Sequence, residues 1–351
     1  MLQDLLDEEA LICPRCRGWR QGDFFMSALR WDVRGDLLAC PACGARYPVI
    51  DDVAVIVTDP AEWLRQQERA VLWRADLSPH LDRWIRGAWD EDADPNWHRQ
   101  MLAVYSRQLT PIEDDDPLAA LRKANRDVHR THQHRIVQAG AQRVIDAGCG
   151  VGNAALSLAA LGASVLAVDH SFAGLRQLSR LLRDGTVHAP RWRHGGDDYT
   201  TVTVTLPETV DPKRIALIAA DMTDPPLRAR SADAVFAYNL VDNVAKPVLL
   251  LQQLHALLKV GGTLALTSPY DWSPRATPRQ ERLMAPDPAQ AVVALLQGQR
   301  PELAPEMAME IVEQKTQPWV LRRHQRSAHV FDSHYVEAVR REPGGSPIKN
   351  R

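Results

Sequence analysis

The run VIDAGCGVGN, residues 144–153, constrains the fold of this 351-residue chain more than any other stretch. Apolar residues and an aspartate lead into glycines at every second position, Gly148, Gly150 and Gly152. Glycine accepts positive φ angles and lets a ligand lie against backbone N–H groups that a side chain would block. A strand that ends in such a loop and opens a helix predicts the first unit of a doubly wound α/β sheet, which binds ligands at the carboxyl ends of its strands.

The segment 136–340 continues this pattern. The strand-like runs RVIDAG, ASVLAVD, IALIAAD, ADAVFAYN and GTLALTS alternate with helix-like runs, which predicts a mostly parallel sheet with helices on both faces. The stretch 188–213 breaks the alternation and predicts an inserted β-hairpin or long loop. The stretch 318–340 predicts two strands joined by a short turn, added antiparallel at the sheet edge.

Three acids at successive strand ends indicate the ligand. Asp146 opens the pattern D-x-G-x-G-x-G, and Asn153 stands where a dinucleotide-binding loop has its third glycine. An acid fits poorly beside a pyrophosphate and suits a cationic or hydrogen-donating group. Asp169 can accept two ribose hydroxyls, and Asp221 can accept from an adenine amino group while Met222 covers the ring. These acids favour S-adenosylmethionine over NAD or ATP.

This constellation resembles the class I S-adenosylmethionine-dependent methyltransferases over about residues 136–338. The resemblance implies a seven-stranded Rossmann-like sheet with an antiparallel strand near its edge. It implies that the three glycines line the methionine moiety, with Asp146 near its amino group, Asp169 at the ribose, and Asp221 and Met222 at the adenine. We assign Asn239 to both cofactor and acceptor. A domain of this fold that binds the cofactor without catalysis, as a scaffold or sensor, is the non-enzymatic alternative.

The first segment, residues 1–58, carries the pairs CPRC (Cys13, Cys16) and CPAC (Cys40, Cys43). Two such turns can close a tetrahedron of sulfur ligands around a structural Zn²⁺, and they fit a zinc ribbon better than a disulfide pair. The segment, with its tail GARYPVIDDVAVIV, resembles the small zinc-ribbon protein that activates several tRNA and protein methyltransferases. That resemblance implies that the ribbon docks on the methyltransferase domain and stabilises it or covers its sheet edge.

The segment 59–135 predicts a tryptophan-rich helical linker whose aromatic residues belong to a core. The tryptophans are Trp63, Trp73, Trp84, Trp89 and Trp97. A helix is expected to start near Pro117. The cluster His129, His132 and His134 is interpreted as a solvated, basic helix face rather than a metal site, with a substrate-facing role open for one of them. Residues 341–351 predict a disordered tail.

The loops after the fourth and fifth strands, YNLVDNV and SPYDWSP, are expected to face the methyl acceptor. Asn239, Asp242 and Tyr270 are the candidate catalytic residues, although Asp242 could instead cap the next helix. These loops resemble the methyltransferase domain of ovothiol-type enzymes, which methylate the imidazole ring of a thiolated histidine. That resemblance implies N-methylation of a small imidazole- or amino-acid-type acceptor.

Composition bounds the alternatives. A net charge of −2 and a pI near 6.6 show no large basic field, which argues mildly against tRNA as the acceptor. A tRNA or protein acceptor, as for relatives of the ribbon, is the competing hypothesis. The motif Asn/Asp-Pro-Pro-aromatic of amide and adenine N-methylation is replaced by Asn239-Leu-Val-Asp. The lack of a long apolar run predicts no membrane partner, and the cysteine use predicts a cytoplasmic protein.

Overall fold

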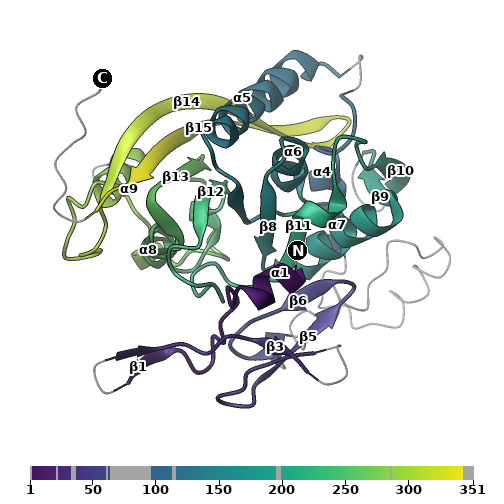
Figure 1. The fold of residues 1–351 in the computed structure, drawn as a ribbon. Helices are drawn as coiled ribbons and strands as arrows, with labels where there is room; N and C mark the ends of the chain where they lie inside the picture. Colours follow the sequence, from purple (N-terminus) through teal and green to yellow (C-terminus); the bar gives the residue numbers. More distant parts are fainter. Residues whose placement is uncertain are drawn as a thin grey trace.

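A computed structural model describes residues 2–20, 23–32, 37–60, 62–63, 96–112, 116–194, 199–284 and 287–342 (Figure 1). Trp73, Trp84, Trp89 and most of the predicted tail lie outside the described residues, and for Trp97 only the backbone is described. Trp63 is buried and packs edge-on against Phe172, so the prediction of a core tryptophan is confirmed at this position. Among the described residues, no helix combines the length and apolar character that crossing a membrane requires.

Within the described residues, the main sheet has 11 strands in the order β14-β15-β13-β12-β7-β8-β11-β6-β5-β4-β3. The seven strands from β14 to β11 form the expected Rossmann-like sheet, in which β15 is antiparallel to β13 and β14 while the inner strands are parallel. Their bounds are β7 Arg143–Ala147, β8 Ser164–Asp169, β11 Ile215–Ala219, β12 Ala232–Tyr238, β13 Leu258–Ser268, β14 Met309–His324 and β15 Ser327–Arg340.

Helices cover both faces of this sheet (Figure 1). They are α4 Asn96–Ser106, α5 Ala119–Gln138, α6 Asn153–Ala160, α7 Phe172–Asp184, α8 Pro247–Leu257 and α9 Pro288–Leu296, with short turns η1 Pro212–Arg214, η2 Val241–Asn243 and η3 Arg279–Glu281. Neighbouring strand residues point to opposite faces, so Val144 joins the core under α5, α6 and α7, while Ile145 joins the core under α8 and α9. Burial on both faces explains the unbroken apolar runs of the inner strands.

The two predicted interruptions are both hairpins. Strands β9 Thr186–Trp192 and β10 Tyr199–Thr205 pair antiparallel between α7 and η1. Strands β14 and β15 form the terminal antiparallel hairpin at the sheet edge. The terminal hairpin begins at Met309, earlier than the expected stretch 318–340, because its first strand continues along the whole length of β15.

The N-terminal segment extends the sheet rather than standing apart from it. After α1 Leu2–Asp7 come β1 Gly18–Arg20, β2 Asp23–Phe25, β3 Arg30–Trp31, β4 Leu37–Ala39, β5 Arg46–Ile50 and β6 Val53–Val55. Strand β6 pairs parallel with β11, the outer strand of the methyltransferase-like sheet. Buried residues of this segment, among them Leu11, Tyr47 and Ile56, belong to the same core cluster as α8 and α9. The expectation that the ribbon covers the sheet edge is therefore confirmed.

Candidate functional site

A cavity of about 850 Å³ opens at the carboxyl ends of β7, β8, β11 and β12, within the size range of small-molecule sites. Most of the predicted cofactor residues line it: Asp146, Gly148, Gly150, Asp169, Asp221, Met222 and Asn239. Gly152 lies at the start of α6 and packs behind the loop. Sequence patterns at strand ends thus converge on one place, because parallel strands end at the same edge of the sheet.

The glycine loop needs glycine for two different reasons. Gly148, Gly150 and Gly152 have φ angles of +75°, +57° and +88°, which side-chain-bearing residues rarely adopt. A Cβ on Gly152 would lie 2.3 Å from a methyl of Leu178, whereas a Cβ on Gly150 would meet nothing within 4 Å. Gly174 of α7, which sequence reasoning missed, lets that helix approach the loop, since its Cβ would lie 2.5 Å from the carbonyl oxygen of Gly150.

Asp169 holds the loop from the neighbouring strand. Its Oδ2 accepts a hydrogen bond from the N–H of Gly150 at 2.7 Å, and its Oδ1 accepts from the N–H of Ser171 at 2.7 Å. Burial raises the pKa of the Asp169 carboxyl, while these two N–H donors act in the opposite direction. The carboxylate therefore organises the ligand-binding loop and still borders the cavity.

Asp146 is a buried acid of the site with one unsatisfied oxygen. It is 2% exposed, and its Oδ2 has no hydrogen-bond partner among the described residues. Burial raises the pKa of this carboxyl to about 7, and repulsion from Asp169 adds to the effect. A buried acceptor without a donor is costly, so this oxygen fits a ligand that brings its own N–H, such as the amino group of S-adenosylmethionine.

Asp221 and Met222 follow β11. Asp221 is exposed, and its Oδ1 accepts from both the backbone N–H and the hydroxyl of Thr223, each at 2.8 Å. Met222 is 4% exposed and offers an apolar surface at the cavity. Oδ2 of Asp221 has no partner among the described residues, so this oxygen could accept from a ligand donor such as an adenine amino group.

Of the three candidate catalytic residues, only Asn239 lines the cavity. It has a φ of +54°, an unusual angle that is enriched at functional sites, and its Oδ1 accepts from the hydroxyls of Thr267 and Ser333 at 3.3 and 3.4 Å. Asp242 and Tyr270 are described residues outside the cavity lining. The hydroxyl of Tyr270 pairs with Nδ1 of His334 at 2.9 Å.

Asp242 fixes the loop that follows β13. Its Oδ2 accepts from the N–H of Asp271 at 2.9 Å, and its backbone carbonyl accepts from the hydroxyl of Thr277 at 3.2 Å. Ser273 and Arg275, within the same loop, do line the cavity. Asp242 therefore contacts the loop that contributes Ser273 and Arg275 to the cavity, and does not itself line the cavity.

Helix α5 supplies residues that sequence reasoning placed in solvent. His132 is 3% exposed and stacks on Tyr335 with ring centroids 3.9 Å apart, and His129 lines the cavity against Tyr238 at 4.6 Å. The interpretation of a solvated helix face is wrong for these two histidines and holds for the exposed His134. Packing of α5 against the distant strands β14 and β15 causes the difference.

The buried face of α5 is polar. Nδ1 of His129, Oε1 of Gln133 and the hydroxyl of Tyr238 are buried without a hydrogen-bond partner among the described residues. Burial lowers the pKa of His129 to about 4, so its imidazole is neutral near pH 7. Tyr105 of α4 also lines the cavity, and burial with the charge of Asp169 raises its pKa to about 12. The run YNLVDNV marked Tyr238, and a substrate-facing role was left open for one histidine, but no local pattern marked Gln133 or Tyr105.

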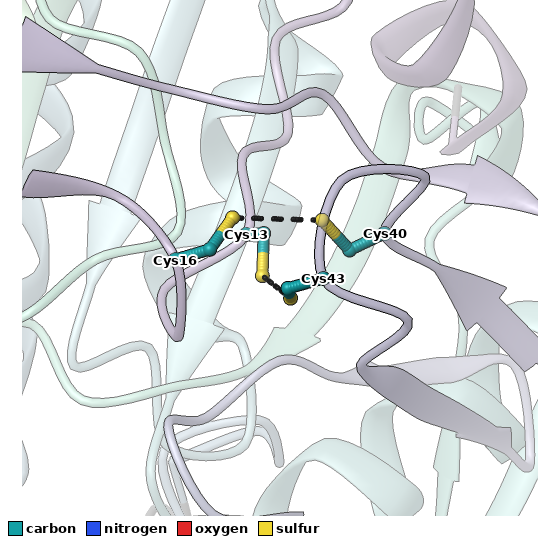
Figure 2. A group of neighbouring side chains, drawn as sticks. All are labelled: Cys13, Cys16, Cys40 and Cys43. Carbon is teal, nitrogen blue, oxygen red and sulfur yellow. Dashed lines mark hydrogen bonds between the residues drawn. The ribbon is translucent and has the colours of Figure 1, made fainter.

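The four predicted metal ligands converge in the N-terminal segment (Figure 2). Their Sγ atoms all lie within 4.8 Å of one another, with Cys13 to Cys43 at 3.7 Å and Cys16 to Cys40 at 3.6 Å. A tetrahedron with Zn–S bonds of about 2.3 Å has edges of about 3.8 Å, so the donor set fits zinc. The hydroxyl groups of Tyr47 and Ser27 lie 3.0 Å from Sγ of Cys13 and 3.3 Å from Sγ of Cys40, as outer partners of a structural site do.

Comparison with known families defines the class of the protein. The family described as "Methyltransferase domain" matches residues 145–266, and the family "Trm112p-like protein" matches residues 7–52. The chain therefore contains a class I S-adenosylmethionine-dependent methyltransferase domain of Rossmann-like fold, preceded by a Trm112-like zinc-ribbon region with a four-cysteine cluster.

Individual relatives are distant. Demethylmenaquinone methyltransferase of Clavibacter sepedonicus is 30% identical over 125 residues, which is 36% of this chain and 40% of that protein. Magnesium protoporphyrin IX methyltransferase from Synechocystis PCC 6803 is 15% identical, covers 76% of this chain and 100% of its own, and has a TM-score of 0.43. A chain from the complex between the Haloferax volcanii Trm112 methyltransferase activator and a methyltransferase is 14% identical over 66% of this chain and 100% of its own, with a TM-score of 0.37.

Proposed function

We propose that this protein transfers the methyl group of S-adenosylmethionine to a nitrogen of a small, planar acceptor of the imidazole or amino-acid type. The observation that carries the cofactor assignment is the unpartnered Oδ2 of Asp146 beside the glycine loop. Asp146 would pair with the amino group of the cofactor, Asp169 with its ribose, and Asp221 and Met222 with its adenine. The cofactor supplies an activated methyl group on a sulfonium.

The residues around Tyr238 would bind and orient the methyl acceptor. Methyl transfer from a sulfonium is an in-line displacement, so the protein mainly aligns the acceptor and excludes water. Tyr238, Asn239 and His129 border the cavity at the carboxyl end of β12 and offer polar atoms and aromatic faces. The imidazole of His129, which burial keeps neutral, can accept a hydrogen bond from an N–H of the acceptor and so orient it. Asp242 and Tyr270 stay in the proposal as positioning residues behind the loop 271–277.

A second candidate acceptor is a tRNA or a protein. It is favoured by the match of residues 7–52 to the Trm112p-like family. The burial of polar atoms at the site favours the small molecule, since the unpartnered atoms of His129, Gln133 and Tyr238 are all buried. A binding-only scaffold would keep cofactor affinity without turnover.

The test uses purified full-length protein, methyl-labelled S-adenosylmethionine and a cell extract divided by size. Label in a compound of low molecular mass supports the proposal, and histidine derivatives are then tried as pure acceptors. Label on RNA or protein supports the second candidate. Cofactor binding with no labelled product in any fraction indicates the scaffold, and absence of cofactor binding contradicts the proposed function altogether.

A further inference from the structure

Helix α5 borders the cavity with a polar stripe whose charge changes along the helix. The lining residues recur at helical spacing: Arg122, Asn125, Arg126, His129, Arg130 and Gln133. Gln133 lies close to Tyr238, which also feels the charge of Asp146. Arg126 lies two helical turns, about 10 Å, nearer the start of the helix. One end of the stripe therefore meets the acids at the strand ends, and the other end is basic.

Arg126 is held in place while part of its guanidinium remains open. Its Nη2 donates to the carbonyl oxygens of Gln108 and Thr110 at 3.2 and 3.1 Å. Its Nε and Nη1 have no partner among the described residues. An arginine fixed by two carbonyl groups can pair with an incoming carboxylate without ordering its own side chain first.

Among the described residues, the neighbouring arginines leave this region positive. Arg122 is neutralised by Asp116 at 2.5 Å and donates to the carbonyl of Arg107 at 3.3 Å. Arg126 and Arg130 have no carboxylate partner within the described part of the chain. Burial and repulsion by Arg122 and Arg130 lower the pKa of Arg126, as expected where positive charge is not compensated. A bound anion would relieve that repulsion.

We propose that the methyl acceptor is a small carboxylic acid whose carboxylate pairs with Arg126 while its reacting nitrogen lies beside the contacting rings of His129 and Tyr238. This inference rests on the proposed function. Arg126 and His129 lie close to one helical turn apart along α5, and one turn is about 5.4 Å. This spacing matches the length of a compact acid of amino-acid size. Asn125, anchored by its Nδ2 to the carbonyl of Pro318 at 2.9 Å, would offer its side-chain oxygen beside the same ligand.

Two other anions fit less well. The carboxylate of the cofactor is bonded to the same carbon as its amino group, so with the amino group at Asp146 it belongs at the Gln133 end of the stripe. A nucleic-acid phosphate needs an open basic track, whereas Arg126 is half-buried and its Nη2 is turned to backbone carbonyls.

The test captures the acceptor by its charge. Immobilised full-length protein is saturated with S-adenosylhomocysteine, whose affinity is first measured by calorimetry. A total extract that contains both metabolites and RNA is passed over it, and the retained compounds are separated by anion exchange and identified by mass. Wild type is compared with Arg126→Gln, with Arg130→Gln as a milder variant at an exposed position, and with Lys123→Gln, an exposed cation of α5 outside the cavity lining.

We expect wild type and Lys123→Gln to retain the same carboxylic acid. Arg126→Gln should retain about 10-fold less, the usual loss for a charge-assisted pair, and Arg130→Gln about 2-fold less, while S-adenosylhomocysteine affinity stays within about 2-fold of wild type. The proposal is overturned if wild type retains cations, neutral compounds or RNA, or retains nothing. It is also overturned if both arginine variants retain as much as wild type. A fall in S-adenosylhomocysteine affinity in Arg126→Gln would place this arginine on the cofactor and also overturn it. Failure of wild type to bind S-adenosylhomocysteine is a separate result, which contradicts the proposed function itself.

Discussion

Val55 of the zinc-ribbon region lies in parallel register with Ala219 of β11, and the N–H of Ile56 donates to the carbonyl of Ala219 at 2.9 Å. The last ribbon strand thus pairs with a strand that would otherwise be an open edge. Exposed edges favour aggregation and leave backbone groups unpaired. Because Ala219 is followed by Asp221 and Met222 at the cavity, the ribbon also supports the part of the site assigned to adenine.

Removal of zinc should therefore weaken the methyltransferase domain as well as the ribbon. Cys16→Ser and Cys40→Ser are expected to lose the metal, because a four-sulfur site needs every ligand, and to lower the melting temperature of the whole chain. Hydrogen exchange should show lost protection at Leu217 and Ala219 of β11, whose backbone groups face β6. Cys149→Ala, which changes the one cysteine outside the cluster, is the control and should keep its zinc. Normal β11 protection in a zinc-free variant would show that the strand pairing does not depend on the metal.

Asp169→Asn should reduce affinity for S-adenosylmethionine by about 1 to 3 kcal/mol, since charge-assisted hydrogen bonds contribute about that amount. The amide keeps one acceptor for the N–H of Gly150 or Ser171, so the loop is disturbed less than by alanine. Calorimetry measures the effect, with Glu208→Gln, at an exposed position, as the control. Equal affinities in the two variants would mean that the ribose assignment is wrong.

Two glycine substitutions should separate the cost of overpacking from the cost of backbone strain. Gly152→Ala brings a Cβ within 2.3 Å of Leu178 at a φ of +88°, so it should cost about 2 to 4 kcal/mol of stability from strain and overpacking. Gly150→Ala meets no atom within 4 Å and should cost about 1 kcal/mol. Denaturant unfolding measures both values, and similar losses in the two variants would contradict the assignment of Gly152 to packing.

Local sequence patterns predicted the strand ends, the glycine loop and the cysteine cluster, because each depends on residues close together in the chain. They could not predict the cavity face of α5. Gln133 is buried and His129 half-buried because α5 packs on strands far away in sequence, as the hydrogen bond from Asn125 to Pro318 illustrates. The sequence suggested that Asp242 caps a helix or contacts the methyl acceptor. Its hydrogen bond from the N–H of Asp271 could not be predicted, because it joins two loops that are distant in sequence.

Asp242→Asn should affect the acceptor more than the cofactor. The substitution weakens the hydrogen bond that the side chain accepts from the N–H of Asp271. It should thereby loosen the loop that presents Ser273 and Arg275 to the cavity. We expect kcat/KM for the acceptor to fall by about 10-fold or more, the scale of one charge-assisted hydrogen bond. Affinity for S-adenosylhomocysteine should stay within about 2-fold. A loss confined to cofactor affinity would contradict a role through the loop.

The raised pKa of Asp146 predicts how cofactor binding and stability depend on pH. Its folded pKa of about 7 lies above its ordinary value of 3.8 because burial favours the neutral acid. The folded state therefore binds an extra proton between these values, so this group makes the free protein less stable as pH rises from about 4 to about 7. A cationic amino group pairs with the ionised carboxylate of Asp146. Affinity for S-adenosylhomocysteine should therefore rise by up to about 10-fold per pH unit as pH increases toward about 7. Above that pH it should level off. Calorimetry between about pH 5.5 and 7.5 measures the slope. Asp146→Asn should bind more weakly at the upper end of this range and show a flat profile, whereas a wild-type slope in that variant would assign the pH dependence to another group.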